Sequence, residues 1–145
     1  MVITICGSMI FAKDMLDIKT QLEAKGIKVI IPIGTKEYLN GKLKKIAGEW
    51  GTIEGAKRKI RYNLIKRYYN EIKKSDAILV INKEKNGIKN YIGGNTFLEM
   101  GFAYVLGKPI YMLNPIPKNI PFFYQEIIAM QPVIIRGDLN QIKYE

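Results

Sequence analysis

Glu99 is the residue of this sequence whose type and surroundings point most directly to chemistry. It lies in the segment GGNTFLEMGFAYVLGKP, residues 93 to 109, where a helix predicted from Thr96 to Leu106 carries no other charged side chain. Burial with few polar partners raises the pKa of a carboxylic acid and sharpens its reactivity. Gly93 and Gly94 leave room for another molecule to approach. Glu99 is therefore a candidate catalytic carboxylate.

The same spacing is equally compatible with a structural role for Glu99. Thr96-Phe97-Leu98-Glu99 matches the capping box, in which a threonine caps a helix and a glutamate three residues later reaches back to its backbone N–H. Such a cap stabilises a helix by about 0.5 to 2 kcal/mol. From the spacing alone, cap and catalyst are two open interpretations.

Gly7 and Ser8, in the segment CGSMIF, are candidates for binding an anion. They directly follow a predicted strand and precede a predicted helix. At such a place, free backbone N–H groups and the helix dipole can bind a phosphate or a carboxylate. The alternative is an ordinary strand-to-helix turn with Ser8 as its cap. Because there is no G-x-G-x-x-G or Walker pattern, both interpretations stay open.

The composition limits which other groups can act. The chain has no histidine and a single cysteine, Cys6, which lies in the apolar run VITIC. An internal disulfide is therefore excluded, and we expect a buried, unreactive thiol. Without histidine, acid–base or nucleophilic chemistry falls to carboxylates, tyrosines or lysines. We expect neither a bound metal nor a cofactor.

The formal net charge of +10 suits an anionic partner, whether nucleic acid, a phosphorylated small molecule or an acidic membrane surface. Much of the charge falls in residues 56 to 74, where apolar side chains recur every four residues at Ile60, Leu64, Tyr68 and Ile72. This pattern is typical of a surface helix with a solvated basic face. A nucleic-acid-binding surface is the less favoured interpretation. No apolar run approaches the roughly 20 residues of a membrane-spanning helix, so we expect no membrane partner.

The order of predicted elements indicates one α/β domain over residues 1 to 145. Apolar, β-branched runs predict five strands, at Val2–Cys6, Lys28–Ile33, Ala77–Asn82, Pro109–Leu113 and Pro132–Arg136. Helical patterns cover Phe11–Lys25, Gly55–Lys74, Thr96–Leu106 and Phe123–Met130. Alternating strands and helices favour a three-layer sandwich with a mostly parallel sheet. We expect a flavodoxin-like or Rossmann-like sheet with the strand order 2-1-3-4-5.

Two long loops accompany these elements. The polar stretch from Gly34 to Gly55 is expected to run over the surface, with a short helix around Leu39 to Ile46. The loop NKEKNGIKNYIGGN, residues 82 to 95, follows the third strand and could close over a ligand. Tyr91 within it could stack on a planar ring or simply pack on its own loop.

The predicted topology locates a binding crevice. Ligands of open parallel sheets bind at the carboxyl ends of the strands, where the strand order reverses, which here is between the first and third strands. Gly7 and Ser8 leave the first of these strands, and the segment from Asn82 to Glu99 leaves the other. Glu99 is therefore expected to lie at the crevice. A leader for export is not expected, because the strand pattern starts at once, and we expect a cytoplasmic protein.

With these residues in place, the sequence resembles the nucleoside 2-deoxyribosyltransferase superfamily, which includes the 2'-deoxynucleoside 5'-phosphate N-hydrolases. The resemblance covers nearly the whole chain and rests on ICGSM, SDAILVIN and NYIGGNTFLEMGFAYVLGKPIY, in which E-x-G-x-A followed by G-K-P is the most specific element. It implies a flavodoxin-like fold, homo-oligomers with sites near subunit contacts, and Glu99 as a nucleophile that attacks the anomeric carbon of a sugar. The base leaves, and water or another base resolves the glycosyl-enzyme ester.

We therefore expect cleavage or exchange of the N-glycosidic bond of a nucleoside or a nucleoside 5'-monophosphate. The expected substrate-binding residues are Gly7, Ser8, Asn82, Tyr91, Gly93, Gly94, Asn95 and Thr96. Three positions depart from the family. Thr4, Tyr68 and Gly93 stand where its enzymes usually carry a tyrosine, an acidic residue and an aspartate or serine.

Two further alternatives remain open. A nucleotide-binding module that kept the fold and lost catalysis would be consistent with the three departures. A phosphoribohydrolase with the signature P-G-G-x-G-T-x-x-E is less favoured, because IGGNTFLE matches it only after one residue is dropped and lacks the proline.

Overall fold

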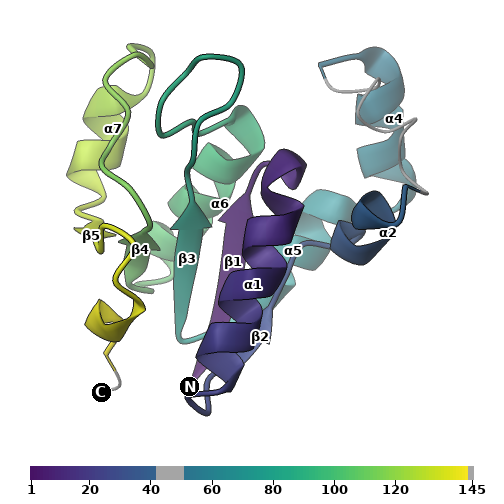
Figure 1. Cartoon of the computed structure of the whole chain (residues 1–145). Helices are drawn as coiled ribbons and strands as arrows, with labels where there is room; N and C mark the ends of the chain where they lie inside the picture. The colour runs from purple at the N-terminus through teal and green to yellow at the C-terminus, as the bar shows by residue number, and fades with distance from the viewer. Residues whose placement is uncertain (42–50, 144–145) are drawn as a thin grey trace.

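The chain folds around a five-stranded, fully parallel sheet (Figure 1). This computed structural model describes residues 1–41 and 51–143. The strands are β1 (Val2–Gly7), β2 (Lys28–Ile30), β3 (Ala77–Ile81), β4 (Ile110–Met112) and β5 (Val133–Ile134). Their order is β2-β1-β3-β4-β5, so the predicted α/β class and strand order are confirmed.

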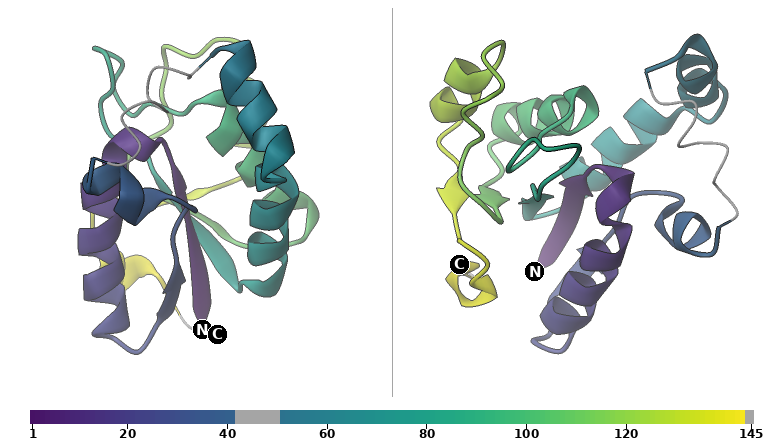
Figure 2. Two further views of the ribbon diagram at one scale, coloured as in Figure 1. Left: turned by 90° about the vertical axis from the view of Figure 1, so that its right-hand side faces the viewer. Right: turned by 45° about the horizontal axis from the view of Figure 1, so that its top comes forward.

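Helices cover both faces of this sheet, which gives the predicted three layers (Figure 2). The helices are α1 (Ala12–Glu23), α2 (Thr35–Leu39), α4 (Ile53–Arg61), α5 (Leu64–Lys74), α6 (Gly94–Val105) and α7 (Tyr124–Ala129), with 3-10 turns η1 (Met9–Phe11) and η2 (Leu139–Gln141). Helix α1 and η2 pack on one face, and α5, α6 and α7 pack on the other. The described residues contain no helix that is long and apolar enough to cross a membrane.

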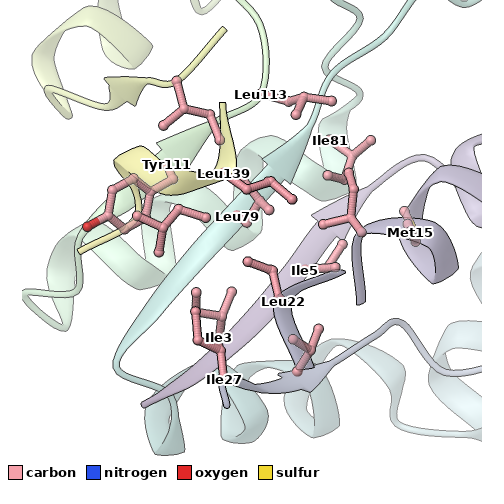
Figure 3. Close-up of a cluster of buried hydrophobic side chains, with 14 of the residues drawn as sticks. Ile3, Ile5, Met15, Leu22, Ile27, Leu79, Ile81, Tyr111, Leu113 and Leu139 are labelled. Atoms are coloured by element: carbon pink, nitrogen blue, oxygen red, sulfur yellow. The ribbon is translucent and has the colours of Figure 1, made fainter. Parts of the chain in front are cut away.

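Side-chain alternation along β1 divides the core into two layers. Ile3 and Ile5 pack with Met15 and Leu22 of α1 (Figure 3), whereas Cys6 packs with side chains of α5 and α6. Successive side chains of a strand point to opposite faces, so this division follows directly from the strand's position in the sheet. Because Cys6 is the last side chain of β1 before Gly7, the carboxyl end of the strand presents its thiol to the face covered by α6.

The helix predicted from Gly55 to Lys74 is in fact two helices, so that prediction is wrong. Helix α4 ends at Arg61 and α5 begins at Leu64, with Asn63 between them in the left-handed conformation at φ 51°. Asparagine adopts this conformation more readily than most residues. The four-residue apolar spacing continues across the break, but Ile60 is 79% exposed. Helix α4 extends beyond the carboxyl ends of the strands (Figure 2), where no sheet covers it.

The stretch from Gly34 to Gly55 starts with α2, which has Gly34 as its N-cap at φ 89°. The short helix predicted around Leu39 to Ile46 is not borne out at its start, because α2 ends at Leu39. The rest of that predicted helix lies in residues 42–50, outside the described part of the chain.

Gly7 provides a test of how closely the carboxyl end of β1 packs. A Cβ atom at this position would lie 2.9 Å from the backbone oxygen of Ile81 and 3.0 Å from Cε of Met15. We predict that Gly7→Ala lowers the free energy of unfolding by about 1 to 3 kcal/mol, because β3 cannot move away without breaking its pairing with β1. Urea unfolding measures this change.

Gly101 is the matched control for that substitution. It lies within α6, and a Cβ there meets nothing within 4 Å. Gly101→Ala should therefore raise the free energy of unfolding by about 0.5 to 1 kcal/mol through helix propensity. Equal effects of the two substitutions would contradict the close approach of β1 and β3.

Candidate active site

A cavity of about 440 Å³ lies at the carboxyl end of the sheet. Its walls come from the segments that follow β1, β2 and β3 and from helices α4, α5 and α6. This volume is within the range of about 300 to 1,000 Å³ that is typical of small-molecule sites. The predicted location, where the chain leaves β1 and β3, therefore coincides with a cavity in the structure.

Glu99 lies inside helix α6 rather than in a capping box. The N-cap is Gly93, the helix begins at Gly94, and the backbone N–H of Phe97 donates to the oxygen of Gly93 at 2.9 Å. No side chain caps this end of the helix, and Thr96 lies within its first turn. The capping interpretation of Glu99 is therefore wrong, because the helix begins two residues earlier than the pattern predicted.

The carboxylate of Glu99 is buried, and one of its oxygens has no partner. Glu99 is 6% exposed and lines the cavity. Its Oε1 accepts a hydrogen bond of 2.7 Å from Nδ2 of Asn95, one turn earlier on α6. Among the described residues, Oε2 is the buried side-chain atom that has no hydrogen-bond partner. A buried polar atom without a partner costs about 1 to 3 kcal/mol, so its presence calls for a reason other than stability.

Burial raises the pKa of Glu99 from 4.5 to about 7. The neighbouring side chain of Cys6 and the charge of Lys59 act in the opposite direction and lower it. A carboxylic acid with this pKa is partly ionised at neutral pH, and its ionised form is weakly solvated. Glu99 can therefore act as a nucleophile or exchange a proton in the pH range where enzymes work.

Cys6 and Tyr68, in the core layer between the sheet and helices α5 and α6, stay uncharged near neutral pH. Burial raises the pKa of the Cys6 thiol, and the charge of Glu99 raises it further. Burial also raises the pKa of Tyr68, whose hydroxyl donates a hydrogen bond to the backbone oxygen of Ile5. Cys6 is fully buried, as expected from the sequence. Neither group competes with Glu99 as the acid or base of the cavity.

The cavity wall also includes a lysine, Lys85, that the sequence did not single out. Nζ of Lys85 donates to Oγ of Ser8 at 3.0 Å and lies 4.8 Å from the ring centroid of Tyr91. Burial lowers the pKa of Lys85. Ser8 makes no side-chain cap, and α1 begins only at Ala12, after a 3-10 turn. The Ser8 hydroxyl is therefore part of a polar group with Lys85, not the cap of a helix.

Most of the residues predicted for the site line this one cavity. They are Gly7, Ser8, Tyr91, Gly93, Gly94, Asn95, Thr96 and Glu99. At Gly93, a Cβ atom would lie 3.0 Å from the hydroxyl oxygen of Tyr91, so the space beside this glycine is filled by Tyr91. At Gly94, a Cβ would meet nothing within 4 Å.

Asn82 is a correction, because it does not line the cavity. It is fully buried, and its Nδ2 donates to the backbone oxygens of Asn114 at 2.9 Å and Pro115 at 3.2 Å. Its Oδ1 accepts from the backbone N–H of Asn114 at 2.9 Å. The amide therefore joins the loops that follow β3 and β4. Both ends of the amide are occupied, which leaves Asn82 a structural role.

The basic residues Arg58 and Lys59 of α4 line the cavity, although the sequence pattern assigned this region to a solvated face. Nζ of Lys59 donates to Oδ1 of Asn95 at 3.2 Å. These two cations could not be singled out from the sequence, because they stand in a run of alternating Lys and Arg. Their location follows from the break at Asn63, which the apolar spacing did not reveal.

Comparison with known proteins supports the fold. No family model matches the chain, and no curated protein matches its sequence. Among solved structures, it is similar to a 2-deoxyribosyltransferase from the psychrotolerant bacterium Bacillus psychrosaccharolyticus, a biocatalyst for the synthesis of nucleosides, with 19% sequence identity and a TM-score of 0.52. The similarity covers 92% of this chain and 98% of that one. The chain therefore has the 2-deoxyribosyltransferase fold, in agreement with the resemblance found in the sequence.

The raised pKa of Glu99 predicts a pH-dependent stability. Because the folded state holds the proton more tightly than the unfolded state, Glu99 contributes stability that is fully present below pH 4.5 and is lost as the pH rises through about 7. We predict that Glu99→Gln removes this loss. Relative to the unsubstituted protein, the variant should gain on the order of 3 kcal/mol in free energy of unfolding between pH 4 and pH 8.

Urea unfolding at several pH values measures this difference, and Glu126→Gln is the matched control because Glu126 is exposed on α7. The control should show no pH-dependent gain. A constant difference between Glu99→Gln and the unsubstituted protein from pH 4 to pH 8 would contradict the buried, weakly solvated carboxylate.

Proposed function

We propose that this chain is an enzyme that cleaves or exchanges the N-glycosidic bond of a nucleoside or a nucleoside 5'-monophosphate, with Glu99 as the nucleophile. The observation that carries the proposal is the buried carboxylate of Glu99, which lines a cavity and has one oxygen, Oε2, without a hydrogen-bond partner among the described residues. A carboxylate nucleophile divides a difficult displacement into two easier steps. The 2-deoxyribosyltransferase fold supports a nucleoside as the substrate, and we infer that the chain is a member of that superfamily.

In the first step, Oε2 of Glu99 attacks the anomeric carbon C1'. The bond between C1' and the base nitrogen breaks, its electron pair leaves with the base, and a glycosyl ester forms on Glu99. The transition state resembles an oxocarbenium ion, as in retaining glycosidases, and the carboxylate stabilises its positive charge. Asn95 holds Oε1, which leaves Oε2 for the sugar.

In the second step, a water molecule or another base attacks C1', the bond between C1' and the Glu99 oxygen breaks, and the carboxylate is released. When water attacks, the proton that it loses neutralises the base that left with the electron pair. The free-energy cost of burying a charged carboxylate also affects how stable the glycosyl ester is relative to the free enzyme. Esterification removes the negative charge, so the cost of burial that raises the pKa of Glu99 also favours the covalent intermediate over the free anion. Burial thus makes the ionised nucleophile more reactive.

The positive charges of the cavity favour a phosphorylated substrate. Arg58, Lys59 and Lys85 line it, and Lys85 contacts Ser8 in the turn after β1. We place the 5'-phosphate or the sugar hydroxyls near Gly7 and Ser8. The wall formed by Tyr91, Gly93, Gly94, Asn95 and Thr96 would then bind the sugar next to Glu99.

Incubation with a panel of nucleosides and nucleoside 5'-monophosphates, followed by chromatography of the free base, tests the reaction. We predict that Glu99→Gln lowers the rate of base release by at least about 100-fold, because the amide cannot form the ester. Glu126→Gln, on the exposed side of α7, should keep the full rate. Undiminished release by Glu99→Gln would rule out the nucleophile, and no release from any compound would rule out the activity.

A nucleotide-binding module without turnover is the second candidate function. It is favoured by Thr4 and Tyr68, whose hydroxyl groups are both occupied by the protein: Thr4 by Ser75 at 2.5 Å, and Tyr68 by the backbone of Ile5. Neither replaces the side chain that the family's enzymes usually carry there, a tyrosine at the position of Thr4 and an acidic residue at that of Tyr68. This candidate expects saturable binding of a nucleotide, seen as a thermal shift, without release of base.

We also propose that the chain forms a homo-oligomer through an apolar groove beside the cavity. The groove is lined by Tyr69, Phe97, Leu98, Gly101, Phe102, Val105, Leu106 and Met130. Leu98 and Phe102 line the cavity as well, so the groove adjoins the cavity. Contiguous exposed apolar patches mark surfaces that bind another protein, a membrane or a ligand, and here we infer contact with a second copy of this chain.

Val105 tests this surface, because it is 84% exposed. We predict that Val105→Glu lowers the sedimentation coefficient to that of a monomer, whereas Lys13→Glu on the opposite face of the sheet leaves it unchanged. A monomeric unsubstituted protein would contradict the proposed contact.

A further inference from the structure

Within residues 1–41 and 51–143, helix α4 makes few packing contacts. It has no buried side chain, and its apolar residues Ile53 and Ile60 are 70% and 79% exposed. Its C-terminus meets α5 at the left-handed Asn63. Because packing contributes so little to its placement, the polar contacts that α4 makes with the cavity wall have a larger share in holding it there.

One of these contacts leads directly to the carboxylate. Nζ of Lys59 on α4 donates to Oδ1 of Asn95 at 3.2 Å, and Nδ2 of the same amide donates to Oε1 of Glu99 at 2.7 Å. Asn95 and Glu99 are four residues apart on α6 and therefore lie on one face of the helix. A cation on one helix is thus connected to a carboxylate on another through a single amide.

The chemistry of the three groups fixes the orientation of that amide. A lysine ammonium can only donate, and an ionised carboxylate can only accept. Asn95 must therefore turn its carbonyl oxygen to Lys59 and its NH₂ group to Glu99. The flipped amide would place an oxygen against the carboxylate and an NH₂ group against the ammonium, and both contacts would be unfavourable. Without Lys59, the carbonyl end of the amide has no such constraint.

We propose that Lys59 is a positioning residue: by orienting the Asn95 amide, it fixes Oε1 of Glu99 and with it the orientation of the carboxylate beside the cavity. The carboxylate of Glu99 is then held in this orientation only while α4 lies against the cavity wall. The catalytic meaning of this arrangement rests on the proposed function, but the connection itself is a property of the ligand-free protein. It can therefore be measured whether or not a substrate is known.

The other groups that face Glu99 do not replace this connection. Cys6 of β1 and Tyr68 of α5 are buried and uncharged near neutral pH, and Glu71 of α5 acts on Tyr68. Lys59 is the cation that lowers the pKa of Glu99. Its effect could pass through the Asn95 amide or directly through space, and an experiment has to separate the two.

Carbon-13 NMR of the glutamate carboxyl groups follows the ionisation of Glu99, with Glu99→Gln identifying its signal. We predict that Lys59→Met raises the pKa of Glu99 by about 0.5 unit or more, and that Lys59→Arg restores most of the original value. Lys57→Met is the matched control, because Lys57 is on the same helix, exposed and outside the cavity wall. It should leave the titration unchanged, and melting temperatures should be the same for all three variants.

The same substitution in an Asn95→Ala background separates the two routes. If Lys59 acts through the amide, Lys59→Met has little further effect once Asn95 is gone, and the two substitutions are not additive. An equal shift in both backgrounds, or no shift in either, would overturn the positioning role. If base release is found, Lys59→Met should lower kcat with little change in KM. If no base is released, the proposed function fails and the titration still decides whether Lys59 orients Glu99.

Discussion

The central constraint on this protein is the buried carboxylate of Glu99, in which only Oε1 has a hydrogen-bond partner among the described residues. Transfer of an ionised carboxyl group out of water is costly unless it is fully hydrogen-bonded. Asn95 donates to Oε1 of Glu99, whereas Oε2 has no hydrogen-bond partner in the part of the chain that the structure describes. Stability would be better served by a second donor or by an apolar side chain at this position. The arrangement is the one expected where reactivity is kept at the expense of stability.

The architecture of the sheet accounts for where this carboxylate lies. Alternation along β1 brings Cys6 to the face covered by α6, and Gly7 lets β1 and β3 approach at their carboxyl ends. Helix α6 begins at Gly94, directly after the loop from β3, so Glu99 is carried to the same edge. A carboxylate placed further along α6 would lie deeper between the helix and the sheet. The position of the nucleophile is thus a consequence of topology and helix start together.

The sequence was sufficient for the parts of the fold that follow from periodicity. Short apolar runs predicted all five strands, and their alternation with helices predicted the order in which the strands pair. It was not sufficient where a periodic pattern continues across a change in structure. The spacing from Ile60 to Ile72 fits one helix, whereas Asn63 divides it, because burial of Ile60 depends on the reach of the sheet and not on the spacing.

The location of the cavity could be predicted from the sequence, but not all of the side chains that line it. Topology brought Ser8 and Glu99 to one edge of the sheet, but it could not distinguish a side chain that faces the cavity from one that joins two loops. Asn82 follows β3 as expected and still turns its amide to Asn114. Conversely, Lys59 and Lys85 are ordinary surface residues by type, and only the three-dimensional path of α4 and of the loop after β3 brings them to the cavity.

The most direct measurement of the central claim is the distance between the nucleophile and the sugar in a crystal structure of the Glu99→Gln variant with a bound nucleoside or nucleoside monophosphate. The account predicts that C1' lies within about 3.5 Å of the carboxamide atom that takes the place of Oε2, in line with bond formation. A sugar bound elsewhere, or with C1' turned away from that atom and beyond van der Waals contact, would contradict it.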